Sequence, residues 1–175
     1  MSLDIPDPLL QLEANCGVFA VWLILKQYQS NIDIAELIQL CRHDYNEGTF
    51  TIALAVALKK LGFEVSFYTA PDPDIDEIEK KIYLEAKQLQ IPIRPALTYE
   101  KIQQAYEDGK FVIVFYDTLD GAGNQSLIYS IDEQEISFCD HFEVMSKAVF
   151  EQQYQADEIC QQAIVVEQPL NFYPI

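Results

Sequence analysis

The chain has 175 residues, half of them hydrophobic, and carries a formal net charge of −17 from 28 acidic and 11 basic residues. This length and apolar content predict one folded domain over residues 1–175 with a sizeable core, and argue against a disordered chain. The negative charge repels phosphate backbones and anionic lipid surfaces, so nucleic acid is not expected as a partner. A neutral or basic partner fits better, although an acidic surface that only keeps the protein soluble explains the charge equally well.

The N-terminus and the cysteines bear on where the protein works. The start "MSLDIPDPLL" lacks the basic and apolar regions of a secretory signal. No run reaches the roughly 18 to 20 apolar residues of a membrane span. The four cysteines form no CxxC pair, and the chain has only two histidines, so neither a metal site nor a cofactor is expected. We therefore expect free thiols and a reducing, cytoplasmic location.

Helical patterns fill the first part of the chain. Residues 17–28 are apolar almost all round, which predicts a helix buried on every side, with Asn15 as its cap. Apolar residues at helical spacing predict an amphipathic helix over residues 31–43. A third helix is expected over residues 50–63, ended by Gly62.

Strand patterns dominate the second part. Alternation over residues 63–70 predicts a half-buried strand, and the apolar run over 111–117 predicts a central one. Further helices are expected over 74–90 and 98–110, a hairpin over 125–131 and 135–140, and a last strand over 163–170. This order favours an α+β fold in which N-terminal helices pack on a C-terminal antiparallel sheet.

Cys16 stands at the start of the first long helix, where a thiol feels the positive end of the helix dipole. That position favours thiolate and suits a nucleophile. Gly17 lets the backbone approach a substrate, and the amide at the helix start can hold an oxyanion. The alternative is that Cys16 is a small buried hydrophobe. The other cysteines, Cys41, Cys139 and Cys160, are expected to be core thiols.

Several segments share their order with a known family. "CGVFAVWLILKQYQSN", "EGT", "ALKKLGFEVSFYTA", "DGKFVIVFYD" and the hairpin ending in "FCD" resemble the papain-like cysteine peptidases that cleave double-glycine leader peptides in bacteriocin export, and their stand-alone bacterial relatives. The resemblance covers about residues 10–166 and implies a papain-like fold with a peptide or protein segment as partner. Cys16 and Gly17 match the nucleophile and its companion.

The resemblance also implies roles for residues outside the Cys-Gly pair. Gln11 lies five residues before Cys16, where the family has a Gln six residues before its cysteine to assist the oxyanion. Asp140 matches the residue that orients the base, with His141 where the family usually has Pro. Counting back along the hairpin from Asp140, the position of the family's catalytic His falls on Asn124.

The expected base is therefore missing. Asn does not exchange a proton at neutral pH, but Asn124 and the adjacent Gln125 can bind a peptide group by hydrogen bonds. His141 lies near Asn124 across the hairpin, and a one-residue slip in register decides whether it faces the same side. His43 follows a helix close to the expected cleft, but is expected to be an exposed loop residue.

Three interpretations follow. The favoured one is a degenerate, leader-peptidase-like pseudoenzyme that keeps Cys16 and Asp140 and binds a peptide or protein segment in its cleft. The second is an active cysteine peptidase or acyl-transfer enzyme with Cys16 as nucleophile and His141 or water replacing the base. The third is an acidic protein-interaction module in which the cleft has no role. The oligomeric state is not indicated by the sequence.

Overall fold

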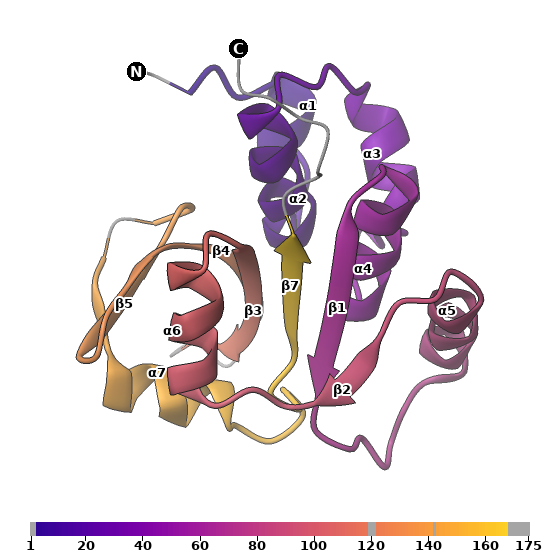
Figure 1. The fold of residues 1–175 in the computed structure, drawn as a ribbon. Coiled ribbons are helices and arrows are strands. Elements are labelled where there is room, and N and C mark those ends of the chain that lie inside the picture. The colour runs from indigo at the N-terminus through magenta and orange to yellow at the C-terminus, as the bar shows by residue number, and fades with distance from the viewer. Residues whose placement is uncertain (1–2, 119–121, 142, 168–175) are drawn as a thin grey trace.

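The computed structural model describes residues 3–118, 122–141 and 143–167. In this part of the chain, strands form a seven-stranded sheet in the order β2-β1-β7-β3-β4-β5-β6, with helices on both of its faces (Figure 1). The strands are β1 (Glu64–Thr69), β2 (Ile93–Pro95), β3 (Phe111–Asp117), β4 (Gly123–Ile131), β5 (Glu135–Phe138), β6 (Met145–Ser146) and β7 (Ala163–Glu167). The mixed α+β class expected from the sequence is confirmed.

The last strand occupies the middle of the sheet. β7 lies between β1 and β3 and is antiparallel to both. Of the described strand pairs, only β1 and β2 run parallel. The expectation of a purely antiparallel sheet is therefore wrong at this edge, because a helix connects β1 to β2 and a crossover of this kind returns the chain in the same direction.

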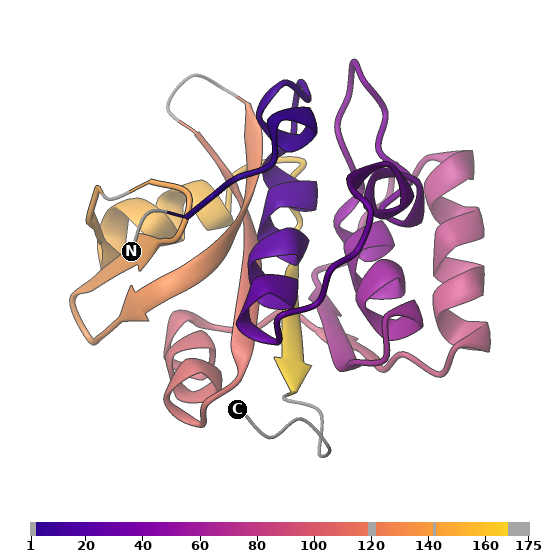
Figure 2. The same ribbon diagram turned by 90° about the horizontal axis from the view of Figure 1, so that it is seen from above.

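Helices cover the sheet in two groups. They are α1 (Asp7–Leu10), α2 (Cys16–Gln27), α3 (Ile34–Leu40), α4 (Thr51–Lys60), α5 (Glu77–Gln88), α6 (Tyr99–Glu107) and α7 (Lys147–Tyr154). α2 packs on β4 and α4 packs on β1 and β7, while α3 and α5 contact α4. α6 and α7 contact β3 and lie in the other group (Figures 1 and 2). No helix in the described ranges has both the length and the apolar character that crossing a bilayer requires.

The sheet separates two hydrophobic clusters, and β3 contributes to both. Ile113 belongs to the cluster beneath α2 and α4, whereas Val112, Val114 and Tyr116 belong to the cluster beneath α6 and α7. Successive side chains of a strand point to opposite faces. The apolar run over 111–117 is continuous because both faces of this strand are buried.

Local sequence signals explain where several helices begin. The Asp33 side chain accepts hydrogen bonds from the amides of Ala35 and Glu36 at the start of α3, as expected of a cap. Asn15 stands at the N-cap position of α2 but has no side-chain capping bond. Its amide donates instead to the Leu9 carbonyl at 2.8 Å. Asn15 therefore ties α2 to α1, which corrects the predicted capping role.

Four short elements were not predicted from the sequence: α1, β2, β6 and α7. α1, β2 and β6 span only two to four residues, too few for a hydrophobic period to emerge. α7 buries only Phe150, Tyr154 and the polar Gln153, so its apolar stripe is narrow. Helices and strands are accordingly less segregated along the chain than expected. The predicted last strand ends at Glu167, and residues 168–170 lie outside the described part.

Candidate functional site

The first turn of α2 lies against β4 and brings Cys16 to Gln125. The Gln125 backbone amide donates to the Cys16 sulfur at 3.5 Å, and Cys16 Sγ lies 3.8 Å from Gln125 Oε1. Cys16 is half-buried. The thiol is thus held between a helix start and a strand, with a backbone amide directed at its sulfur.

The Gln125 side chain connects this thiol to α4. Its Nε2 donates to the Thr49 carbonyl at 2.7 Å and to Thr51 Oγ1 at 3.0 Å, and the residue is only 4% exposed. Its Oε1 lies 2.4 Å from the point where a Cβ on Gly17 would stand. From the sequence, the space beside Gly17 was expected to admit a substrate. The structure fills it with the Gln125 side chain, so the glycine is required by packing.

A group of polar side chains surrounds Asp140, at the end of the hairpin. We call Tyr116, Asn124, Ser126, Asp140 and His141 the Asp140 cluster. Ser126 Oγ donates to Asp140 Oδ2 at 2.9 Å, and Asn124 Nδ2 lies 3.4 Å from the same oxygen. Asn124 Nδ2 also donates to Tyr116 Oη at 2.8 Å. The amide of Asn124 therefore faces the carboxylate that the resemblance assigns to orienting a base.

His141 joins the cluster through Tyr116. Its Nε2 lies 3.0 Å from Tyr116 Oη, and its ring packs 5.4 Å from that of Phe138. Strand pairing aligns Ile128 with Phe138 and shifts by one residue at Ser130. Sequence reasoning set the two registers as alternatives, one for Asp140 and one for His141. The structure instead brings both residues to the cluster, with Tyr116 between His141 and Asn124.

Tyr116 and Ser126 were not singled out from the sequence. Ser126 lies two residues after Asn124 on β4, and Tyr116 pairs with Asn124 across the β3–β4 register. Residues two apart on a strand share a face, as do paired residues on neighbouring strands. The signal was therefore present in the alternation, but it depends on a register that the sequence does not specify.

The electrostatic surroundings of Cys16 oppose ionisation. Burial raises the pKa of the Cys16 thiol above its ordinary value, and the nearby charge of Asp140 raises it further. The amides of Gln125 and Gly17 lower this pKa, but by less than burial raises it. The expected lowering by the helix start is therefore outweighed, because none of the described groups that shift the thiol is a cation.

The remaining predicted residues lie in three different settings. Gln11 is exposed at the C-terminal end of α1; in the described structure its side chain makes no hydrogen bond to Cys16. His43 was expected to be exposed but is half-buried, with Nδ1 3.1 Å from Thr49 Oγ1 and Nε2 buried without a partner. Burial lowers the pKa of His43, which favours the neutral form of its ring.

The other cysteines agree only in part with the expectation of core thiols. Cys41 is fully buried, whereas Cys139 and Cys160 are half-buried. Cys160 lies between α7 and β7 with a positive φ of 56°. Burial raises the pKa of the Cys41 thiol to about 12 and that of Cys139 to about 11. The expectation is thus wrong for Cys160, because it falls in a turn and not in an element.

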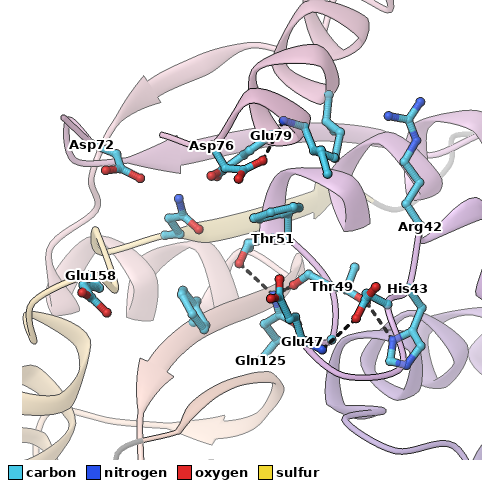
Figure 3. Close-up of a pocket in the computed structure, with 17 residues that line it drawn as sticks. Arg42, His43, Glu47, Thr49, Thr51, Asp72, Asp76, Glu79, Gln125 and Glu158 are labelled. Atoms are coloured by element: carbon cyan, nitrogen blue, oxygen red, sulfur yellow. Dashed lines mark hydrogen bonds between the residues drawn. The ribbon is translucent and has the colours of Figure 1, made fainter. Parts of the chain in front are cut away.

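A cavity of about 450 Å³ opens beside Gln125. Its walls come from α4 and the segment before it, the start of α5, β4 and the turn before β7 (Figure 3). The lining includes six acids: Asp44, Glu47, Asp72, Asp76, Glu79 and Glu158. We call this the acidic cavity. Sequence reasoning missed it because its acids come from separate segments that only the fold brings together.

Comparison with known proteins agrees with this architecture. Residues 9–93 match the model of the peptidase C39 family. The resemblance to this family is confirmed. The fold is similar to that in the crystal structure of the peptidase domain of Streptococcus ComA, a bifunctional ABC transporter involved in a quorum-sensing pathway, with a TM-score of 0.51. The two are 20% identical, over 86% of this chain and 89% of that one. No curated protein matches the chain.

The similarity to the C39 family identifies the fold class as papain-like. What the site can do chemically has to be inferred from its residues. An identity of 20% supports a shared fold and carries no further inference. Within the described ranges, no group of three or more His, Cys, Asp or Glu side chains is placed to hold a metal ion. The chemistry available at this site is therefore that of a thiol, amides, hydroxyls, one imidazole and several carboxylates.

The contact between Gly17 and Gln125 predicts the effect of a single methyl group. Gly17→Ala places its Cβ against Gln125 Oε1 and within 3.0 Å of Leu54, and overpacking of this kind costs about 1–3 kcal/mol. Urea unfolding of Gly17→Ala, with and without Gln125→Ala, measures the coupling. We expect the glycine substitution to cost less when Gln125 is absent. Equal costs in both backgrounds would show that Gln125 is not the obstacle.

The acidic cavity predicts a pH-dependent stability. Burial, with the charges of Asp72 and Asp76, raises the pKa of Glu79 from 4.5 to about 7. The folded state therefore holds this proton more tightly than the unfolded state, and stability is lost as pH rises through this interval. Relative to the unchanged protein, Glu79→Gln is expected to raise the free energy of unfolding near pH 8 by up to about 3 kcal/mol. The gain should shrink to under about 1 kcal/mol near pH 5.

Glu77→Gln is the matched control for this measurement. Glu77 lies on the same helix but is exposed and pairs with Lys80, so its loss should change the free energy of unfolding little at either pH. Chemical denaturation of the three proteins at both pH values gives the comparison. A stabilisation of Glu79→Gln that does not depend on pH would mean that the cost at this position is not one of ionisation.

Proposed function

We propose that this protein is a degenerate relative of the C39 leader peptidases, which binds a peptide or protein segment beside Cys16 without cleaving it. One observation carries the proposal: the amide of Asn124 lies 3.4 Å from the Asp140 carboxylate, at the position where the family resemblance calls for an imidazole. The site keeps a nucleophile-like thiol at Cys16 and a carboxylate at Asp140, but the amide beside that carboxylate cannot exchange a proton at neutral pH.

The missing imidazole has a direct chemical cost. A papain-like reaction needs a base that takes the thiol proton and returns it to the leaving amine, and such assistance is typically worth about 10² to 10⁴ in rate. Asn124 does neither. The raised pKa of Cys16 adds to the deficit, because a neutral thiol is a poor nucleophile.

The same residues are suited to holding a peptide. A side-chain amide donates and accepts hydrogen bonds, so Asn124 can pair with a peptide group, and it is half-buried. The charge of −17 favours a neutral or basic segment as the partner. The unpaired state of all four cysteines supports the expectation of a reducing, cytoplasmic compartment.

A second candidate function is an active cysteine peptidase or acyl-transfer enzyme. His141 favours it, because its Nε2 lies 3.0 Å from Tyr116 Oη, which in turn accepts a hydrogen bond from Asn124. This series of contacts is a path for a proton towards the cleft. It reaches Asn124, and an amide interrupts it there, so we rank this candidate second.

Thiol reactivity distinguishes the two candidates. Alkylation by iodoacetamide, followed for each cysteine against pH by mass spectrometry, should show Cys16 reacting slowly with an apparent pKa above the ordinary value of about 8.5. Asn124→His should lower that apparent pKa and speed the reaction of Cys16 at neutral pH, since an imidazolium favours the thiolate. Asn124→Gln, which keeps an amide, serves as the control and should leave the rate low. Fast alkylation of Cys16 in the unchanged protein, with a low apparent pKa, would favour the active enzyme.

Peptide binding tests the proposal directly. A fluorescently labelled peptide with a Gly-Gly pair at its centre should raise fluorescence polarisation on mixing with the protein and remain intact on incubation. Cys16→Ala and Asn124→Ala should weaken its binding. If the unchanged protein cleaves the peptide and Cys16→Ala does not, the protein is an active cysteine peptidase and the proposal is wrong. Binding that ignores both substitutions and falls steeply with salt would favour the acidic interaction module, because exposed charges are screened over about 8 to 10 Å at moderate ionic strength.

A further inference from the structure

The acidic cavity has far more negative charge than the chain itself neutralises. Among the residues that line it, Arg42 is the cation, and its guanidinium is paired with Glu85 on α5. No ion pair within the described ranges involves Asp72, Asp76, Glu79 or Glu158. The hydrogen bonds of Asp72 and Asp76 are to nearby backbone amides. The cavity therefore presents carboxylates that have no cationic partner.

Glu79 provides an observation independent of this clustering. Its side chain is only 7% exposed and it lines the cavity. In the part of the chain that the structure describes, no hydrogen bond or ion pair satisfies its carboxylate. Its oxygens are not among the fully buried unpaired atoms of the described residues, so they face the open cavity, where a charge or a donor can pair with them. Figure 3 places its carboxylate beside that of Asp76 on one wall, facing the side of Thr51 and Gln125.

The dimensions of the cavity indicate what kind of cation fits. A volume of about 450 Å³ is in the range of small-molecule sites, roughly 300 to 1,000 Å³. That is far more room than a bare ion needs. The acids are spread around the cavity, with Asp72 and Glu158 at the left of Figure 3 and Asp76 and Glu79 at the top. An extended cation, with an apolar stem and a charged end, suits such a space.

Gln125 joins the cavity to the peptide site. It lines the cavity, and its amide and Oε1 contact the Cys16 sulfur. Gln125 thus contacts both the Cys16 sulfur and the cavity, so a peptide bound beside Cys16 lies close to the cavity wall that Gln125 forms. Phe115 and Ile82 contribute apolar lining, which suits the methylene stem of a long cationic side chain.

We propose that the acidic cavity receives the cationic side chain of a lysine or arginine from the bound peptide and so selects basic segments. The inference rests on the proposed peptide-binding function and names the substrate class of that site. Glu79 supplies the buried carboxylate that the cation pairs with, and Asp72 and Asp76 add to the negative potential. Charge-assisted hydrogen bonds to a guanidinium or ammonium satisfy Glu79, which has no partner in the free protein.

Two tripeptides that differ only in charge test this proposal. Acetyl-Gly-Arg-Gly-amide and its citrulline counterpart have nearly the same shape, but citrulline is neutral. Titrated into the full chain and followed by NMR, the arginine peptide should shift the backbone amides of Thr51, Glu79 and Gln125 in a saturable way, and the citrulline peptide should not. Glu79→Gln should weaken the arginine peptide about tenfold. Glu77→Gln, on the same helix but outside the cavity, should leave its affinity unchanged.

Other outcomes would overturn the proposal. Equal shifts by the arginine and citrulline peptides would mean that charge is not recognised. Saturable binding of cadaverine without binding of the arginine peptide would assign the cavity to a free diamine, and binding of Mg²⁺ or Ca²⁺ alone would assign it to a metal ion. Absence of saturable shifts with the arginine peptide would exclude a cationic side chain. The Gly-Gly peptide experiment decides the proposed function separately, because Cys16 and Asn124 lie outside this cavity.

Discussion

The side chain of Gln125 holds three elements of the protein together. From β4 it bonds to the segment that starts α4, at Thr49 and Thr51, and it packs against Gly17 at the start of α2. Both of its amide hydrogens are used, and the residue is almost completely buried. Gln125 therefore fixes the position of the Cys16 thiol and of the cavity wall relative to the sheet. Any rearrangement around Cys16 must either keep these bonds or replace them.

The amide of Asn124 bears on the electrostatics around Asp140 and Cys16. In a papain-like arrangement, an imidazolium between thiolate and carboxylate balances two negative charges. Here an amide stands beside Asp140, and an amide is neutral in every protonation state near neutral pH. The carboxylate charge then acts on Cys16 without compensation and raises its pKa. The described partners of the Asp140 carboxylate are the Asn124 amide and the Ser126 hydroxyl, neither of which carries a positive charge.

The sequence predicted the parts of the molecule that depend on local patterns. The apolar run after Cys16 became a helix buried on all sides, with Val18, Val21 and Ile24 fully buried. The family resemblance pointed to Asn124 and Asp140 as one site with the register left open, and in the structure the Asn124 amide lies 3.4 Å from the Asp140 carboxylate. In each case the pattern spans neighbouring residues or a single turn, so the chain itself fixes the geometry.

Features that depend on distant segments were not predicted. The acids of the cavity come from the segment before α4, from α5 and its approach, and from the turn before β7, and nothing in the sequence relates them. The direction of the Cys16 pKa depends on how deeply the thiol is buried, which competes with the helix start and is set by packing. The bonds of Gln125 to Thr49 and Thr51 span more than 70 residues.

The central place of β7 has a consequence for how the chain folds. β1 and β3 do not pair with each other; each pairs with β7, which is made of residues 163–167 and follows both strands in the chain. During synthesis, the edges of β1 and β3 that pair with β7 therefore stay unpaired until β7 has been made. Contacts of such long sequence separation slow folding, and unpaired strand edges invite aggregation. A nascent chain that lacks β7 is therefore the form of this protein most in need of a chaperone.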